Sequence, residues 1–169
     1  MITLIIGGLL TYFSQWGTDR RQHQAARQAL ETDRAYRRQE RRETFELEHL
    51  LRLNEALMRY ARAVGRMHHH DSMVAKTSSV YASHLLPEDI SQEAHETGRD
   101  VLGSMNLALD DELRAKVNQA YELLSDVESM TKTTPDRAKA AMLTAIDAYR
   151  EALNGIAARI RQIYLDQAI

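Results

Sequence analysis

The chain has 169 residues, of which 44% are hydrophobic and 27% are charged, and it holds only 2 prolines and 7 glycines. So few breakers exclude collagen, low-complexity disorder and a turn-rich all-β fold, and the length fits one domain with an arm. Cysteine is absent, which excludes a disulfide framework, a thiolate nucleophile and a zinc site with Cys ligands.

The net charge of −2 is unevenly distributed along the chain. Residues 1–16 have no charged side chain, and residues 17–42 hold eight arginines against four acidic residues. Residues 67–169 hold ten Lys or Arg residues and sixteen Asp or Glu residues. The sequence therefore predicts an apolar tip, a basic stretch and an acidic body, in that order.

The uncharged segment 1–16 is predicted to anchor the chain in a membrane. As a helix it would be about 24 Å long, whereas a hydrocarbon core is about 30 Å thick. The span would therefore rely on a thinner bilayer or on snorkelling of Arg20 and Arg21. A buried core helix and a secretory signal peptide are the alternatives, although the basic start and small-residue cleavage site of a signal peptide are missing. We assign residues 1–17 to the anchor.

Basic residues follow the apolar segment, and none precedes it. The positive-inside rule then predicts a single-pass protein of the cell membrane with its C-terminal body in the cytoplasm. Tyr12 and Trp16 stand where interfacial aromatic residues belong. Thr3, Gly7 and Thr11 recur every four residues, and such a stripe of small residues allows close packing against another membrane helix.

A long helix is predicted from residue 18 to residue 66, because this stretch lacks proline and is rich in good helix formers. Residues 18–43 have no continuous apolar stripe and are interpreted as a basic helical stalk. From residue 44 onward, apolar spacing predicts a packing seam that consists of Leu47, Leu50, Asn54, Leu57, Ala61 and Val64. Asn54 either fixes the register of a partner or lies at the edge of the seam, bonded to water.

After this helix we expect a corner at residues 65–71, a weaker helical stretch at residues 72–86, and then three further helices. Proline and capping residues mark their expected starts, which are Pro87, Asp110 or Asp111, and Thr134-Pro135-Asp136. Their predicted inward faces are Ile90, Ala94, Val101, Leu102 and Met105; Leu113, Val117, Ala120, Leu124 and Val127; and Ile146, Tyr149, Leu153, Ile156, Ile160 and Ile163. The predicted fold is all-α, with an N-terminal apolar helix that continues into a long helix, followed by an antiparallel helical bundle over residues 44–169.

The run His68-His69-His70-Asp71 is the main cluster of residues that could ligate a metal ion. Neighbouring residues of a helix point about 100° apart, so the four side chains cannot all face one ion. A metal site would need a carboxylate or a histidine brought in by folding, or a second chain; the histidine candidates are His84 and His95. Without such a ligand the run is a histidine-rich surface corner.

Glu46-Leu-Glu-His49 has the Glu-x-x-His spacing of di-iron helical bundles, which need this motif on two helices. The sequence contains no glycine-rich phosphate loop and no Gly-x-Ser-x-Gly elbow. We therefore assign no catalytic, cofactor-binding or metal-binding residue, expect no cofactor, and do not expect an enzyme.

The arginines of residues 17–42 could in principle bind nucleic acid. Acidic residues interrupt them, however, and Tyr36 is the one aromatic residue among them. Attraction to anionic lipid headgroups is the simpler interpretation, worth about 1 kcal/mol for each basic residue near the surface. Beyond Arg27, lipid attraction and a plain solvated helix face remain equally good interpretations, and no nucleic-acid partner is expected.

Three short segments of the chain match a pattern found in other bacterial proteins. They are Gly7-Gly8, the junction Gln15-Trp16-Gly17-Thr18-Asp19-Arg20-Arg21, and Val101-Leu102-Gly103-Ser104. With these pieces the chain resembles a loose group of uncharacterised bacterial proteins of the actinobacterial type. These have a short N-terminal membrane anchor, an Arg/Glu-rich helix and a helical bundle. The resemblance implies this layout, but it implies no activity and supplies no catalytic residue.

The expected function is that of a single-pass, membrane-anchored helical scaffold or adaptor, such as an accessory subunit of a larger membrane complex. Its expected partners are the lipid bilayer and either further copies of the chain or another membrane protein. The alternative is a four-helix sensor or a bundle that binds a small ligand or a metal ion. Polar side chains that converge inside the bundle would favour this alternative.

Overall fold

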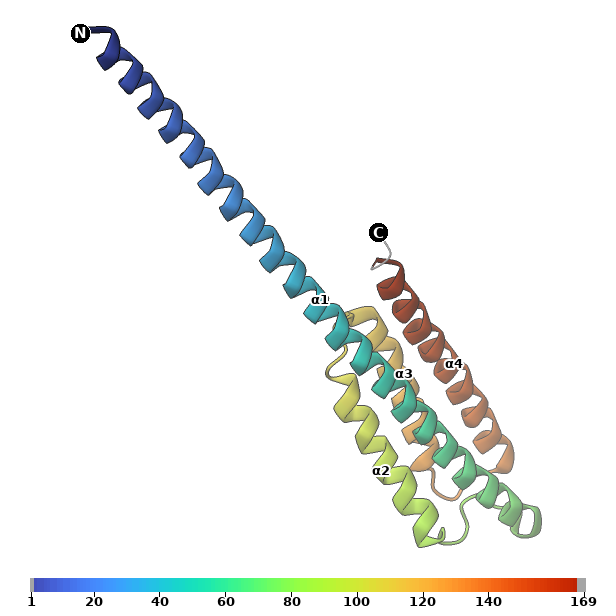
Figure 1. Cartoon of the computed structure of the whole chain (residues 1–169). Coiled ribbons are helices and arrows are strands. Elements are labelled where there is room, and N and C mark those ends of the chain that lie inside the picture. Colours follow the sequence, from blue (N-terminus) through green and yellow to red (C-terminus); the bar gives the residue numbers. More distant parts are fainter. Residues whose placement is uncertain (1, 167–169) are drawn as a thin grey trace. The chain divides into compact units, whose positions relative to one another are not determined.

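A computed structural model describes the backbone of residues 2–166 and the side chains of residue 24 and residues 26–166. It contains four helices, α1 (Ile2–Ser78), α2 (Glu88–Met105), α3 (Asp111–Glu128) and α4 (Pro135–Asp166), and residues 2–166 contain no strand (Figure 1). The predicted all-α fold is confirmed. The chain divides into two compact units, Met1–Thr44 and Phe45–Ile169.

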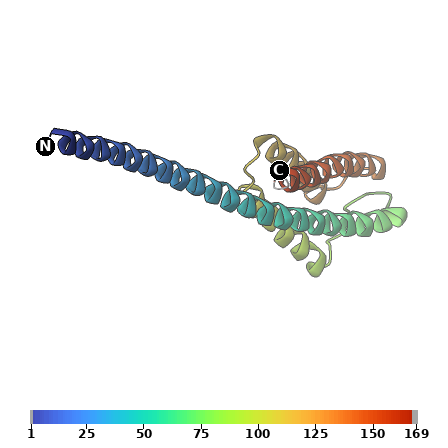
Figure 2. The same cartoon turned by 45° about the horizontal axis from the view of Figure 1, so that its top comes forward.

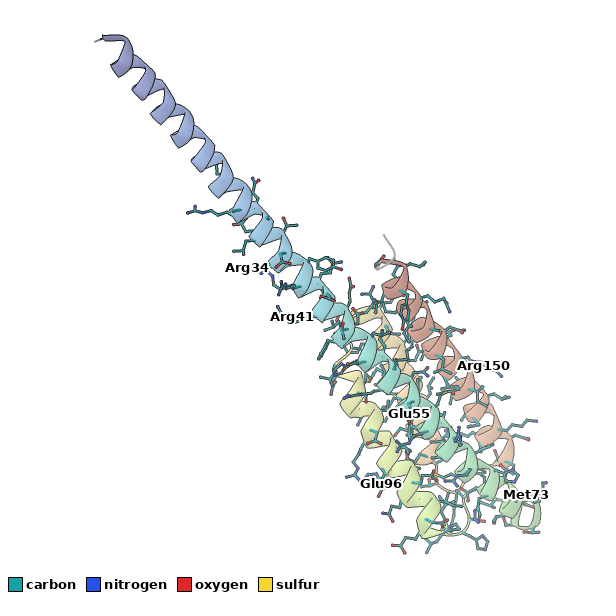
Figure 3. All side chains as sticks on the ribbon, viewed as in Figure 1. Arg34, Arg41, Glu55, Met73, Glu96 and Arg150 are labelled. Atoms are coloured by element: carbon teal, nitrogen blue, oxygen red, sulfur yellow. The ribbon has the colours of Figure 1, made fainter. Side chains whose placement is uncertain are left out.

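The first unit is helical from Ile2 onward. All described side chains between residues 24 and 42 are exposed, and Figure 3 shows Arg34 and Arg41 projecting from the helix. Arg37 Nε lies 3.1 Å from the carboxylate of Asp33, the acid four residues before it. The anchor predicted at residues 1–17, with its aromatic residues and its stripe of small residues, has side chains outside the described set. In the part of the chain that the structure describes, no helix is apolar over a sufficient length to cross a membrane.

The second unit is an antiparallel bundle, in which residues 45–78 of α1 pack beside α2, α3 and α4 (Figures 1 and 2). Short loops join the helices, so successive helices run in opposite directions. The α1–α2 and α3–α4 loops meet at one end of the bundle. There Tyr81 and Thr133 exchange two backbone hydrogen bonds, of 2.9 and 3.2 Å.

The predicted corner at residues 65–71 is wrong, because α1 continues through it to Ser78. Gly65 costs the helix only about 1 kcal/mol. Met67, Asp71 and Ala75 repeat every four residues and are all buried, so packing against the bundle stabilises these turns. The helix ends at Ser78, and it is followed by Ser79, whose φ of 60° is left-handed and whose amide donates to Ala75 O at 2.8 Å. The weaker helical stretch at residues 72–86 is therefore helical only as far as Ser78.

The predicted starts of the other three helices are confirmed. Pro87 is the residue before α2, and Pro135 is the first residue of α4. Asp110 is the N-cap of α3, where its carboxylate accepts a hydrogen bond of 2.9 Å from the amide of Leu113. Each of these residues affects only the first turn of its helix, so the local sequence is sufficient to predict where the helix starts.

The core draws buried residues from all four helices. The face predicted for α3 is buried as expected. On α1 the seam is rotated from the prediction, because Leu53 and Tyr60 are buried whereas Leu47, Asn54 and Ala61 are only half-buried. Asn54 thus lies at the edge of the seam. On α2 the predicted inward residue Leu102 is exposed.

Alanines form much of the buried face of α4. The residues of this face are Ala138, Ala145, Ala148, Ala152, Ile156 and Ile163. Of the predicted face, Ile156 and Ile163 are buried, whereas the other four residues are half-buried on its flanks. Small side chains at a helix contact allow the two axes to approach closely, and larger neighbours then close the sides of the contact.

Tyr60 is one of the two largest fully buried side chains among the described residues, and it joins three helices. Its hydroxyl donates a 2.6 Å hydrogen bond to the Glu128 carboxylate at the end of α3, and its ring stacks on Tyr121 with centroids 5.5 Å apart. Gly98 of α2 brings its backbone against the same ring. Burial and the Glu128 carboxylate both raise the pKa of Tyr60. The phenol is therefore a neutral structural donor.

Candidate functional site

Glu46 and His49, the residues of the Glu-x-x-His motif, have separate surroundings. The buried Glu46 carboxylate accepts two hydrogen bonds from Arg159 of α4, at 2.6 Å from Nε and 2.9 Å from Nη2. The His49 ring lies tilted by 30° against the ring of Phe45, with centroids 3.9 Å apart, and its Nδ1 lies 2.7 Å from Phe45 O. Arg159 thus uses both oxygens of the carboxylate that a metal ion would need.

The run from His68 to Asp71 lies within α1, where its side chains are distributed around the helix. Asp71 is buried, His68 and His70 are half-buried, and His69 is exposed. No group of three or more His, Asp or Glu side chains among the described residues is arranged to hold a metal ion.

His68 is the member of the run that the fold brings into contact with another segment. Its Nδ1 lies 3.0 Å from the hydroxyl of Tyr81, which the loop after α1 places against the helix, and the two ring centroids are 5.3 Å apart. Its Nε2 lies 3.5 Å from Ser72 Oγ, one turn further along α1. Both ring nitrogens thus have polar neighbours, and the protonation of the ring decides which atoms donate.

Asp71 carries negative charge into this cluster. His70 Nδ1 lies 3.6 Å from Asp71 Oδ1, and within the described residues this nitrogen is buried without a hydrogen-bond partner. Burial, with a contribution from Asp71, raises the pKa of Tyr81 to about 12. Burial also lowers the pKa of His68, against the opposing effect of Asp71. At neutral pH the tyrosine and His68 are therefore both uncharged.

A groove of about 650 Å³ adjoins His68, between the last turns of α1 and the first turns of α4. Its walls are mainly apolar and include Gly65, Ala75, Met142 and Ile146. Lys76 of α1 and Lys139 of α4 also line it. Figure 3 labels Met73 at this end of α1, where the ammonium of Lys76 lies 3.3 Å from the sulfur of Met73.

A second groove, of about 390 Å³, lies between α1 and α2 and is polar. Its lining residues include Arg52, Arg59 and Arg99 together with Glu55 and Asp100. Arg59 crosses to Asp100 with a contact of 3.1 Å. Opposite charges largely balance across this groove, so it is a contact between two helices more than a binding surface.

The sequence indicated His68 but not its surroundings. The hydroxyl of Tyr81 and the two lysines of the groove reach this end of the bundle from other segments, and no local pattern connects these residues. Neither a known protein family, nor a curated protein, nor a solved structure matches this chain.

Proposed function

We propose that the protein is a membrane-anchored helical scaffold, in which residues 1–17 insert into a bilayer and residues 44–169 present a helical bundle to a partner. One observation carries this proposal. Sixteen residues without a charged side chain precede a stretch of eight arginines and four acids, residues 17–42, and residues 2–42 belong to α1. Apolar insertion and attraction of arginines to anionic headgroups then act on one helix.

The anchor is shorter than a standard span. About 20 apolar residues cross a hydrocarbon core, so a segment of sixteen needs a locally thinner bilayer, or a companion helix that shares the cost. Thr3, Gly7 and Thr11 provide a stripe of small residues for such a companion. For this reason the proposal includes a partner within the membrane, either a second copy or another membrane protein.

The bundle interior favours a scaffold over a sensor with a ligand in its core. Among the described residues, the buried polar side chains are Glu46, Asp71 and Thr97. Glu46 is satisfied by Arg159, and the hydroxyl of Thr97 donates to carbonyls of its own helix. Asp71 lies at one end of the bundle, beside His70. A ligand site in the core would need several such groups to converge between the helices.

Alkaline carbonate extraction of cell membranes tests the anchor. The full chain should stay in the membrane pellet. Leu9→Arg should release it into the soluble fraction, because an arginine in the span costs about 2.5–3.5 kcal/mol. Leu30→Arg is the matched control, since Leu30 is already half exposed on the stalk, and this variant should stay in the pellet. Release of the unmodified chain by carbonate would contradict the proposal.

Light scattering of the full chain in mild detergent tests for the partner. A scaffold that pairs through its anchor and stalk should be an oligomer, or should purify with a second protein. A monomer that purifies alone, with a stalk that proteases cleave at Arg37 and Arg41, would indicate a flexible tether.

A further inference from the structure

The groove between α1 and α4 has the size and lining of a site for a small molecule. Its volume of about 650 Å³ falls within the range of about 300–1,000 Å³ that is typical of ligand pockets. Gly65 contributes directly to this space, since a Cβ built on it would meet only Met142 Cε, at 3.9 Å. The groove therefore exists partly because this position has no side chain.

The charge of the groove is not neutralised. Lys76 and Lys139 are two of the four lysines in the chain, and they come from different helices. Within the described residues neither forms an ion pair with a carboxylate, and the polar contact of Lys76 is to the sulfur of Met73. Asp136 is the one acidic residue that lines the groove. The groove thus combines an apolar wall with a net positive rim.

An apolar wall beside unpaired ammonium groups is complementary to a molecule with one apolar chain and one anionic head. A metal ion is disfavoured, because the described residues contain no suitable cluster of ligands. A cationic or a purely polar ligand would leave the lysines or the apolar wall without a partner. From this complementarity we propose that the groove binds a single-chain anionic amphiphile, of which a long-chain fatty acid carboxylate is the simplest example.

In the bound state the carboxylate lies between Lys76 and Lys139, and the alkyl chain runs along Ala75, Met142 and Ile146 towards Gly65. All of these residues belong to the unit Phe45–Ile169. The binding site therefore stands or falls independently of the proposed membrane anchor.

Photolabelling of the full chain with a diazirine analogue of dodecanoate tests this proposal. The purified chain is incubated together with nanodiscs of zwitterionic lipid, whether or not it inserts into them, and labelled peptides are identified by mass spectrometry. Labels are expected in residues 65–76 and 135–146. A matching probe with a phosphate head should label the same peptides, and a stronger signal than that of the carboxylate would assign the groove to a lysophospholipid-type head group within the same class.

Two variants act on the site in different ways. Lys76→Glu combined with Lys139→Glu should reduce labelling at these peptides by at least tenfold, which corresponds to about 1.4 kcal/mol. Gly65→Leu should also reduce it by filling the groove, and this change raises helix propensity, so loss of folding is not expected. Lys132→Glu is the control, because Lys132 is exposed on the α3–α4 loop and does not line the groove.

Three results would overturn the proposal. The first is labelling that persists in both variants, and the second is labelling that falls mainly outside the two segments. The third is equal labelling by an alkyl ammonium probe of the same length, since this would show apolar adhesion without recognition of charge. Circular dichroism of each variant establishes that a loss of labelling is not a loss of the bundle.

Discussion

The ion pair between Glu46 and Arg159 should respond unequally to removal of its two partners. The side chain of Glu46 is 4% exposed, whereas that of Arg159 is 33% exposed. Arg159→Met would leave a buried carboxylate without the two hydrogen bonds of 2.6 and 2.9 Å that it now accepts. Loss of one partner of a buried pair costs about 3–5 kcal/mol. We expect the lower end, about 3 kcal/mol, because the arginine side of the pair faces water.

Glu46→Leu should cost only about 1 kcal/mol, because the guanidinium of Arg159 can turn towards solvent and recover its hydration. The double variant should lie within about 1 kcal/mol of the unmodified chain, since an apolar pair can replace a buried ion pair. Urea unfolding followed by circular dichroism measures all three free energies, and an unchanged m value confirms that they are comparable. Equal losses of stability in Glu46→Leu and Arg159→Met would contradict this expected asymmetry.

Four further predictions follow from single positions. Leu57→Ala should lower the free energy of unfolding by about 2–5 kcal/mol in urea, because the side chain is fully buried; a loss below about 0.5 kcal/mol would place it outside the core. Gly98→Ala should cost about 1 kcal/mol in the same assay, because its Cβ would lie 3.1 Å from the anchored ring of Tyr60, and a gain in stability would contradict this. Ser79→Gly should raise stability by about 0.5 kcal/mol in thermal unfolding, since Ser79 has a φ of 60°, and a lower Tm would refute it. Burial lowers the pKa of His68, so the unfolded chain binds this proton first as pH falls. The stability that His68 contributes is complete above its ordinary pKa of about 6.5 and is lost as pH falls through the folded-state value. His68→Gln should therefore flatten the decline of Tm below about pH 6.5, and an unchanged slope would refute it.

The sequence was sufficient for features that a few neighbouring residues determine. Pro87, Asp110 and Pro135 mark helix starts because a proline ring or a capping carboxylate acts within one turn. The α3 face was also predicted in full, because its apolar residues repeat cleanly and are bounded by charged residues.

Features that depend on packing between helices were not predictable in the same way. The continuation of α1 through the histidine run depends on burial of Met67 and Ala75 by other helices. The alanine face of α4 has a weak signal in the sequence, because alanines occupy the centre of a close helix contact and the bulky residues lie on its flanks.

The candidate site shows the same division. The run of three histidines draws attention to His68 in the sequence. Its contact with Tyr81, however, depends on how the loop after α1 folds back. The spacing of Glu46 and His49 matches a metal-binding motif, whereas the structure pairs the Glu46 carboxylate with Arg159, which is 113 residues away. Lys76 and Lys139 carried no signal in the sequence, because only the packing of α1 on α4 places both at one groove.

Depth measurement with a fluorescent label tests the membrane-anchored scaffold most directly. The chain has no cysteine, so Leu9→Cys and Leu30→Cys each create one site for an environment-sensitive dye. In vesicles with anionic lipid, the dye at position 9 should shift to the blue and be quenched by lipids brominated in their acyl chains. The dye at position 30 should be quenched by aqueous iodide instead. Equal iodide quenching at both positions, with no blue shift at position 9, would contradict the account.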